Sequence, residues 1–520
     1  MRENAKEWLR LVLCLGLLSI STPAISELPP RIIIKYKDAG SAATKSASPL
    51  KTGFGPNTEI VTVHPTSVLN AEQIITKLKD DPTVEYAEID RVFTANFEPG
   101  DGATTEDPQY SNQWHYGAIN MPDAWDESLG STNTVVAVID TGYTDHSEFS
   151  GKILPGFDFV SDPVMGNDGN GYDNDAHDAG DFISFGDPCF NGSTHNSSWH
   201  GTHVAGTILA NTGNGVGVAG INWNAKLLPV RVLGKCGGYL SDIANGIRWA
   251  AGGGVSGVPS NPNPANVINL SLGGSGACGS TLQSAIDFAN SQGTVVVVAA
   301  GNSNQNIDIF ATSPANCNGV ITVGASNSSS NKASYSNYGQ WIDVSAPGGE
   351  QSTGVLSTHN NGAQALGSES YTSMAGTSMA APHVAGVASL MLGLNPGLFP
   401  AQVRLILRDT AQSFGFGSTC AVFGTCGSGI IDAAQAVLTA QVTVPDASVT
   451  VPEIPAPSSG IAPQQPNNPG ISGDDSSGGC GSVTYANGGG GGPGGPMASL
   501  FLGVFLMLLS SKIKQWNISL

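Results

Sequence analysis

The segment Val-Val-Ala-Val-Ile-Asp-Thr-Gly, at positions 135–142, decides the fold of this chain. An unbroken apolar run of strand length, here 134–139, is typical of a strand that is buried on both faces. Asp140 therefore places a carboxylate at the carboxyl end of a central strand. Four more runs of the same kind follow, at 227–233, 267–272, 295–300 and 320–323.

Segments with helical spacing lie between and after these runs, at 200–210, 241–251, 282–292, 378–392 and 400–409. Strands that alternate with helices predict an α/β fold, a doubly wound parallel sheet flanked by helices on both faces. Ligands of such sheets bind at the carboxyl ends of the strands, so we expect the functional site beside Asp140.

The composition excludes several classes of protein. A chain of 520 residues is too long for one ordinary domain, and its 40% hydrophobic residues exclude wholesale disorder. Because charged residues make up only 12%, coiled coils are excluded as well. The formal net charge of −20 would repel phosphate backbones, so we expect no nucleic acid as a partner.

Two further motifs complete a chemical constellation with Asp140. His200 opens His-Gly-Thr-His-Val-Ala-Gly, and Ser378 lies in Gly-Thr-Ser-Met-Ala-Ala-Pro-His-Val-Ala-Gly, where the first turn of a helix presents its hydroxyl. Each motif alone is weak evidence, since a serine at a helix start is also a common N-cap and an aspartate at a strand end often caps a turn. Together they place Asp, His and Ser in that order along the chain.

The three motifs together resemble the subtilisin-like serine proteases, and the resemblance covers residues 107–440. It implies a subtilisin-like sheet and a serine endopeptidase in which Ser378 is the nucleophile and His200 its base. Asp140 would hold the correct tautomer of His200. His203, one turn along the same helix, is a buried structural residue in this family.

The resemblance also implies an oxyanion site and a substrate cleft. Asn302, in Ala-Ala-Gly-Asn, matches the side-chain donor of the family, with the backbone N–H of Ser378 as the second donor. The alternative for Asn302 is a simple turn residue. The expected substrate-binding residues follow two of the strands: Ser271, Leu272, Gly273, Ala300 and Gly301.

Calcium is the expected cofactor. Eight aspartates and no Lys or Arg lie between Asp158 and Asp187, a density that requires a counter-charge. Hard oxygen ligands from Asp168, Asp173 and Asp175 suit calcium, although the spacing is not that of an EF-hand, and a solvated acidic loop is the alternative.

Two more calcium sites are implied by the resemblance alone. One would use the side chains of Asp107, Glu148 and Asn214 with the carbonyls of Thr212, Val216 and Val218, where Glu148 replaces the usual aspartate of the family. The other would use Asp343 with the carbonyls of Asn318 and Val320, and a turn-capping aspartate is the competing interpretation.

Six of the eight cysteines lie within residues 107–440, an even set that favours disulfides over metal or thiol chemistry in an exported chain. Six cysteines allow 15 pairings. We expect the sequential set: Cys189 with Cys236, Cys278 with Cys317, and Cys420 with Cys426. Cys480 is either a modification or crosslink site or an idle thiol.

The ends of the chain carry targeting signals. Residues 1–26 have the basic start, apolar core and small-residue end of a secretory signal peptide. Residues 27–106 predict a small α+β unit, a propeptide that would act as an intramolecular inhibitor. Residues 441–487 are rich in Pro, Ser and Gly and indicate a linker.

Residues 488–520 combine a glycine run, an apolar stretch and two lysines, and they resemble the Gly-Gly sorting tails of secreted Gram-negative proteins. Such tails are removed by an intramembrane protease, and a permanent anchor is the alternative. We therefore expect transient membrane association at most.

These features predict a secreted, calcium-stabilised, monomeric serine endopeptidase from a Gram-negative bacterium, made as an autoprocessed zymogen that acts on proteins and peptides. It could remain at the cell surface before or after its tail is removed. The competing hypothesis is a catalytically silent adhesin or binding module on the same fold.

Overall fold

The computed structural model describes residues 31–37, 58–62, 71–90, 105–190, 192–415, 418, 420–421 and 424–451. The expected signal peptide, most of the expected linker, the tail and Cys480 lie outside the described residues. The chain divides into two compact units, Met1–Glu98 and Pro99–Leu520.

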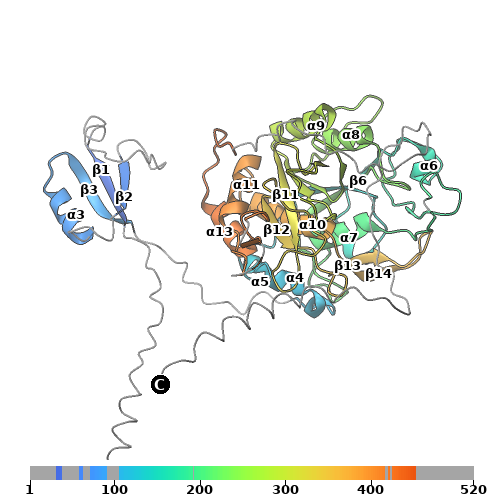
Figure 1. The fold of residues 1–520 in the computed structure, drawn as a ribbon, viewed down its shortest axis with the longest axis horizontal. Helices are drawn as coiled ribbons and strands as arrows, with labels where there is room; N and C mark the ends of the chain where they lie inside the picture. Colours follow the sequence, from blue (N-terminus) through green and yellow to red (C-terminus); the bar gives the residue numbers. More distant parts are fainter. Residues whose placement is uncertain are drawn as a thin grey trace, which may run out of the picture. The chain divides into compact units, whose positions relative to one another are not determined.

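The first unit is a small α+β fold, as its sequence predicts. Three antiparallel strands pair in the order β2-β1-β3, and one helix packs on them (Figure 1). Alternate residues of β1, Ile32, Ile34 and Tyr36, point into the core because side chains of a strand alternate between its faces. The elements are β1 Arg31–Tyr36, β2 Thr58–Thr62, α3 Ala71–Lys79 and β3 Val84–Asp90.

The second unit is built on a seven-stranded, wholly parallel sheet in the order β12-β11-β9-β7-β4-β6-β5. The five predicted runs are all strands of it, which confirms the predicted fold class. The two edge strands were not predicted: β5 has only two residues, and Ser345 and Pro347 interrupt the apolar pattern of β12. The strands are β4 Val135–Asp140, β5 Phe157–Asp158, β6 Lys226–Arg231, β7 Val267–Leu270, β9 Val295–Ala299, β11 Val320–Ser326 and β12 Val344–Pro347.

Both faces of this sheet are buried, by different sets of helices (Figure 1). Val136 and Val138 of β4 face the core beneath α7, α10 and α13, whereas Ala137 and Ile139 face α8 and α9. This double burial explains why the strands read as unbroken apolar runs. The helices are α7 His200–Leu209, α8 Leu240–Ala250, α9 Ser280–Ser291, α10 Thr377–Leu394, α11 Pro400–Asp409 and α13 Ala433–Val442.

Smaller elements surround this framework. The hairpin of β13 and β14 packs against α7, and the two-residue strands β8 and β10 pair beside the carboxyl end of β7. Helix α10 is long and apolar enough to cross a membrane, but its burial identifies it as the core helix of the unit. These elements are η1 Tyr110–Asn112, α4 Trp114–Gly117, α5 Met121–Glu127, η2 Ser147–Phe149, α6 Pro163–Gly166, β8 Gly274–Ser275, β10 Thr312–Ser313, β13 Val355–Asn360 and β14 Glu369–Met374.

The folded unit extends past the boundary expected at residue 440. Helix α13 ends at Val442, and the side chain of Gln402 then holds the following segment by bonds to Val444 O (2.9 Å) and from Asp446 N (3.0 Å). The side chain of Gln402 therefore holds residues 444–446, which lie in the expected linker, against the domain. Composition gives no sign of these contacts because they are made by a distant helix, α11.

Three disulfides join the pairs expected from the sequential set, Cys189–Cys236, Cys278–Cys317 and Cys420–Cys426. Their Cα atoms lie 5.5, 5.1 and 5.3 Å apart, within the ordinary range for a disulfide.

Candidate active site

The carboxyl edge of the sheet brings Asp140 and His200 into contact. Asp140 is the last residue of β4, and His200 is the first residue of α7. The imidazole Nδ1 lies 2.8 Å from Asp140 Oδ1 and 3.0 Å from Oδ2, and both side chains are buried. A carboxylate at Nδ1 requires a proton there, which leaves Nε2 as the basic nitrogen.

The surroundings of His200 make it more basic. Burial acts to lower the pKa of His200, but the charge and hydrogen bond of Asp140, with the charges of Asp181 and Asp178, outweigh it and raise that pKa above its ordinary value. A histidine that readily accepts a proton is what general-base catalysis requires.

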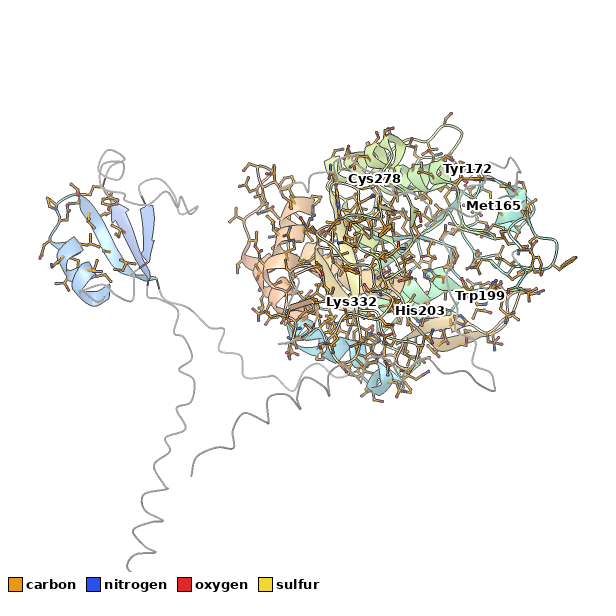
Figure 2. The ribbon with its side chains drawn as sticks, viewed as in Figure 1. Met165, Tyr172, Trp199, His203, Cys278 and Lys332 are labelled. Carbon is orange, nitrogen blue, oxygen red and sulfur yellow. A yellow bond between two sulfur atoms is a disulfide. The ribbon has the colours of Figure 1, made fainter. Side chains whose placement is uncertain are left out.

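His203 lies one turn further along α7 and has a different role (Figure 2). Its Nε2 lies 3.0 Å from Val355 O and 3.1 Å from Thr372 O, so it links α7 to the β13–β14 hairpin. Burial lowers its pKa to about 3. These contacts agree with the expectation that His203 is structural.

Ser378 is the second residue of α10 and is paired with Ser271, which follows β7. The Ser378 hydroxyl donates to Ser271 O (3.1 Å), and the Ser271 hydroxyl donates back to Ser378 O (2.8 Å). The Ser378 carbonyl is free to accept this bond because Pro382, four residues later, has no N–H. The reciprocal bonds fix the backbone of the nucleophile against the end of β7.

Asn302, three residues beyond the end of β9, has a fixed amide orientation. Its Oδ1 accepts from Thr377 N (2.8 Å) and from Thr377 Oγ1 (2.9 Å), so Nδ2 must point the other way. A methyl group added at Gly376 would lie 3.5 Å from Asn302 Nδ2 and 3.6 Å from Ser378 N. The two predicted oxyanion donors therefore flank one common point.

Thr377 is a functional residue that the sequence analysis missed. Besides its bonds to Asn302, its hydroxyl accepts from Gly301 N (3.0 Å), so it ties the end of β9 to the start of α10. Its position directly before the serine in Gly-Thr-Ser was the available signal.

The expected substrate-binding residues lie at the same edge of the sheet. Ser271, Leu272 and Gly273 continue from β7, and Ala300 and Gly301 continue from the neighbouring strand β9. Exposure increases along the first segment, from buried Ser271 to exposed Gly273. The two segments thus emerge side by side next to Ser378 and Asn302.

The acidic loop contains a protein cation beside Asp168, where calcium was expected as the counter-charge. Arg231, the last residue of β6, is almost fully buried and its guanidinium pairs with both Asp158 and Asp168. His177 Nδ1 lies 2.5 Å from Asp175, and Asp173 accepts from Asn170 and from the backbone of Asp175. Sequence analysis did not identify this cation because it comes from a strand some sixty positions later in the chain.

Asp343, expected as a calcium ligand, is paired with protein cations instead. Asp343 Oδ1 accepts from Arg404 Nε (2.8 Å) and lies 3.6 Å from Arg408, and Oδ2 accepts from Thr322 N (3.0 Å). The Asn318 carbonyl, a second expected ligand, accepts from Gln283 (3.0 Å), and Val320 belongs to β11. A protein guanidinium already neutralises this carboxylate.

The set around Asp107 and Glu148 is different, and its donors suit calcium. Both carboxylates are buried, and no Lys or Arg of the described residues forms an ion pair with either. Asn214 donates to both through its backbone and its amide. Among the described residues, no hydrogen bond ends on the carbonyl oxygens of Thr212, Val216 or Val218.

The electrostatics of this set also favour a cation. Burial is the main reason that the pKa of Glu148 is raised, and the negative charge of Asp107 acts in the same direction. These two effects outweigh the hydrogen bonds to Glu148, which lower its pKa. The described residues hold no group of three or more His, Cys, Asp or Glu side chains arranged for a metal, so amide and carbonyl oxygens would have to complete the shell, as calcium permits.

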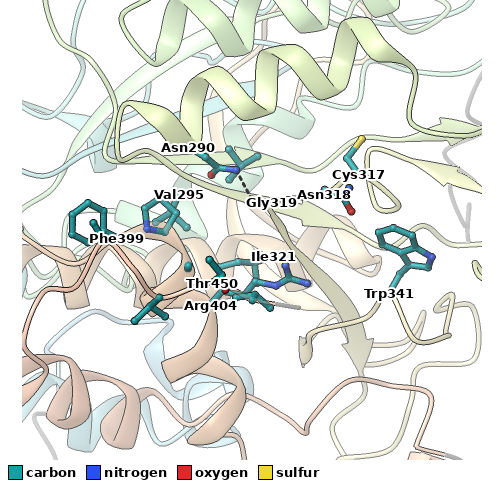
Figure 3. Close-up of a pocket in the computed structure, with 16 residues that line it drawn as sticks. Asn290, Val295, Cys317, Asn318, Gly319, Ile321, Trp341, Phe399, Arg404 and Thr450 are labelled. Atoms are coloured by element: carbon teal, nitrogen blue, oxygen red, sulfur yellow. Dashed lines mark hydrogen bonds between the residues drawn. The ribbon is translucent and has the colours of Figure 1, made fainter. Parts of the chain in front are cut away.

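A cavity of about 350 Å³ lies away from this chemistry, at the amino ends of β9 and β11 (Figure 3). Its lining includes Val295, Ile321, Trp341 and Phe399, with Arg404 already paired to Asp343. An apolar cavity without a free acid, base or nucleophile cannot carry the hydrolysis, whereas the carboxyl edge can.

Comparison with known proteins identifies the family of this chain. The family model described as "Subtilase family" matches residues 131–432. The chain is 44% identical over 446 residues to the "Extracellular protease" of Xanthomonas campestris pv. campestris, covering 80% of this chain and 74% of that protein. It is 40% identical over 451 residues to the "Extracellular basic protease" of Dichelobacter nodosus, covering 80% and 72%.

Among solved structures, the fold matches one titled "Proteases from Pseudoalteromonas arctica PAMC 21717", with a TM-score of 0.62 and 53% sequence identity. The match covers 65% of this chain and 100% of that chain.

Proposed function

The chain belongs to the subtilase family of secreted serine endopeptidases, and we propose that Asp140, His200, Ser378 and Asn302 carry its hydrolysis of peptide bonds. The observation that carries this assignment is the short contact of Asp140 with His200 Nδ1, at the edge where Asn302 Nδ2 and Ser378 N flank one point. No observation favours the alternative of a silent binding module, since every chemical group of the triad is present.

In the first step the Ser378 hydroxyl leaves Ser271 O, donates to His200 Nε2 and attacks the substrate carbonyl. His200 takes the hydroxyl proton as the C–O bond forms, and Asp140 stabilises the resulting imidazolium. The carbonyl oxygen becomes an oxyanion, which accepts from Asn302 Nδ2 and Ser378 N. This step requires the Ser378 side chain to rotate from Ser271 O toward His200. Catalytic hydrogen bonds are often long or poorly aligned before substrate binds.

The tetrahedral intermediate then collapses. His200 returns its proton to the amide nitrogen, the C–N bond breaks, and the amine leaves while the acyl group stays on Ser378 Oγ. A water molecule then attacks the acyl carbon and gives a proton to His200. The bond between the acyl carbon and Ser378 Oγ breaks, His200 returns the proton to that oxygen, and the carboxylic acid leaves. Ser271, Leu272 and Gly273 would meanwhile pair with the substrate backbone as an added strand.

Substitution of the nucleophile tests the assignment. Ser378→Ala should abolish casein hydrolysis and labelling by an active-site serine reagent, whereas Ser373→Ala, a change at an exposed serine on β14, should leave both unchanged. Full activity or labelling in Ser378→Ala would refute the proposed nucleophile. Wild-type protein that folds but takes no label would instead favour the silent binding module.

Residues 27–106 are proposed as the inhibitory propeptide, supported by the separate compact α+β unit ahead of the catalytic domain. Since release would be autocatalytic, Ser378→Ala should accumulate as a precursor that active enzyme added in trans converts to the mature size. Removal of the sorting tail is proposed on the sequence alone, and mature protein in the medium without the residues after Gly488 would support it.

Calcium is proposed at Asp107, Glu148 and Asn214, with carbonyls of Thr212, Val216 and Val218 as further ligands. Bound there, the ion would neutralise two buried carboxylates and tie the 212–218 loop to η2. Calorimetric titration with calcium should show binding to the wild type, weaker binding to Glu148→Gln, and unchanged binding to Asp168→Asn. Equal binding by Glu148→Gln, or lost binding in Asp168→Asn, would exclude this site.

A further inference from the structure

The helix that carries His200 begins without an ordinary cap. Its N-cap residue, Trp199, has a left-handed backbone with φ of +48° and provides no side-chain hydrogen bond. The first backbone N–H groups of a helix lack partners within it and must find acceptors elsewhere. The position of His200 therefore depends on whatever satisfies these groups.

Two side-chain hydroxyl groups accept hydrogen bonds from the first backbone N–H groups of this helix. Ser198 Oγ accepts from His200 N (3.3 Å), and Thr141 Oγ1 accepts from Gly201 N (3.0 Å). Thr141 N also donates to Asp140 Oδ1 (2.7 Å), so this threonine links Asp140 to Gly201, the residue that follows His200.

Each of these hydroxyl groups also donates a hydrogen bond to an aspartate other than Asp140. Thr141 Oγ1 donates to Asp178 Oδ2 (2.6 Å), and Ser198 Oγ donates to Asp181 Oδ2 (2.7 Å). Asp181 Oδ1 accepts from Ser198 N (2.5 Å) as well. Two carboxylates three positions apart thus hold both sides of the His200 backbone, each through one hydroxyl.

We propose that Asp178 and Asp181 are positioning residues for the proposed reaction, which fix His200 through Thr141 and Ser198 and stabilise its imidazolium by their negative charge. Asp178 is about 1% exposed, so its charge is poorly screened by solvent. The arrangement supplements Asp140, which alone contacts the ring. Sequence reasoning had assigned Asp178 and Asp181 no role beyond the acidic loop.

Other charged groups face this cluster from each neighbouring element. His203 lies on the same helix, and its charge would oppose that of His200. His359 of β13 contacts Ser198 O through Nε2 (3.1 Å), and Arg231 of β6 acts on Asp178. Burial and then the charge of Asp181 raise the pKa of Asp178 to about 7, so its contribution grows as the pH rises through neutrality.

The test separates charge from position. Asp178→Asn and Asp181→Asn each keep an acceptor oxygen for the hydroxyl but remove the charge, so the acid limb of kcat/KM should move to lower pH by about 0.5 to 1. At the plateau kcat should fall about tenfold with little change in KM. The imidazolium of His200 forms only as the reaction proceeds, so weaker stabilisation of it raises the barrier without weakening substrate binding. Asp145→Asn, at a side chain that is 90% exposed, makes the same charge change near the site and should move neither.

Thr141 provides the second arm. Thr141→Ser keeps the hydroxyl and should retain kcat, whereas Thr141→Val breaks the link to Gly201 and should lower kcat. Rates are taken per active site, counted with a serine reagent, so that partial misfolding does not mimic an effect on kcat. If Asp178→Asn yields no folded enzyme, Asp181→Asn at the less buried carboxylate decides the charge effect.

An unchanged acid limb in Asp181→Asn, or one moved equally by Asp145→Asn, would overturn the proposal. Equal kcat in Thr141→Ser and Thr141→Val would overturn the positioning role. These failures differ from failure of the proposed function itself, which would appear as full activity in Ser378→Ala.

Discussion

An aspartate is buried at the carboxyl ends of the sheet strands, here called the carboxyl edge, and another at their amino ends, the amino edge. The partner of each aspartate decides what it contributes to the protein. At the carboxyl edge Asp140 contacts an imidazole, 2.8 Å away, that can take up and release a proton. At the amino edge Asp343 contacts the guanidinium of Arg404, also at 2.8 Å, which stays protonated at any relevant pH.

The comparison shows that a buried carboxylate at a strand end is not itself a sign of catalysis. With a titratable partner it supports a base, as at His200. With a permanent cation it forms a structural ion pair that ties α11 to the start of β12. Activity should therefore be sensitive at one edge and stability at the other.

The largest expected effect is the loss of activity in Asp140→Asn. An amide at Nδ1 favours the wrong tautomer of His200, so kcat should fall about 10⁴-fold while the fold is kept. Casein hydrolysis and denaturant unfolding measure the two properties. A loss of stability comparable with that of the amino-edge variant would contradict the division between the edges.

The converse change is Asp343→Asn, which leaves the partly buried Arg404 guanidinium without its charged partner. We expect a loss of about 3 kcal/mol in the free energy of unfolding and an unchanged kcat. Asp126→Asn, an exposed aspartate in α5, serves as the matched control for loss of one negative charge. A tenfold fall in kcat for Asp343→Asn would mean that the two edges are coupled.

Asn302→Ala sharpens the account of the carboxyl edge. Removing one oxyanion donor should lower kcat by about 10²- to 10³-fold with KM nearly unchanged, because the donor acts on the transition state. Thr377→Val removes one of the two hydrogen bonds that Asn302 Oδ1 accepts and should show a smaller loss in the same direction. An effect confined to KM would instead assign Asn302 to substrate binding.

The smallest expected effect is on the pH dependence of stability, and it comes from a buried histidine outside the proposed active site. His383 of α10 lies in the core, 2.8 Å from His115, and burial lowers its pKa to about 4. A folded pKa below the ordinary 6.5 means that its contribution to stability is complete above pH 6.5 and is lost as the pH falls toward 4. The maximum loss is about 3 kcal/mol, reached only at the acid limit.

Urea unfolding of enzyme inactivated with a serine reagent, measured between pH 7 and pH 4, checks this expectation without autolysis. His195→Gln, at a part-exposed histidine outside the core, should leave the pH dependence in place. Constant stability across the range would contradict the assignment of a neutral, buried His383.

Much of the fold and of the site was predictable, for reasons visible in particular residues. Strands such as β9, Val295–Ala299, are apolar throughout because the sheet is covered on both faces, and the triad motifs are local in sequence. The edge strand β5 has two residues and leaves no such pattern. The counter-charges Arg231 and Arg404 were missed because each lies far in sequence from the aspartate that it neutralises.

Local order along the chain was enough to establish the α/β class, the reacting groups and the even set of cysteines, since apolar periodicity and short motifs act over neighbouring positions. Only the tertiary structure decided which carboxylates meet an imidazole, which meet a guanidinium and which, like Glu148, meet neither. The reason is physical: the state of a buried charge depends on groups within a few ångströms in space, and folding draws those groups from anywhere in the sequence.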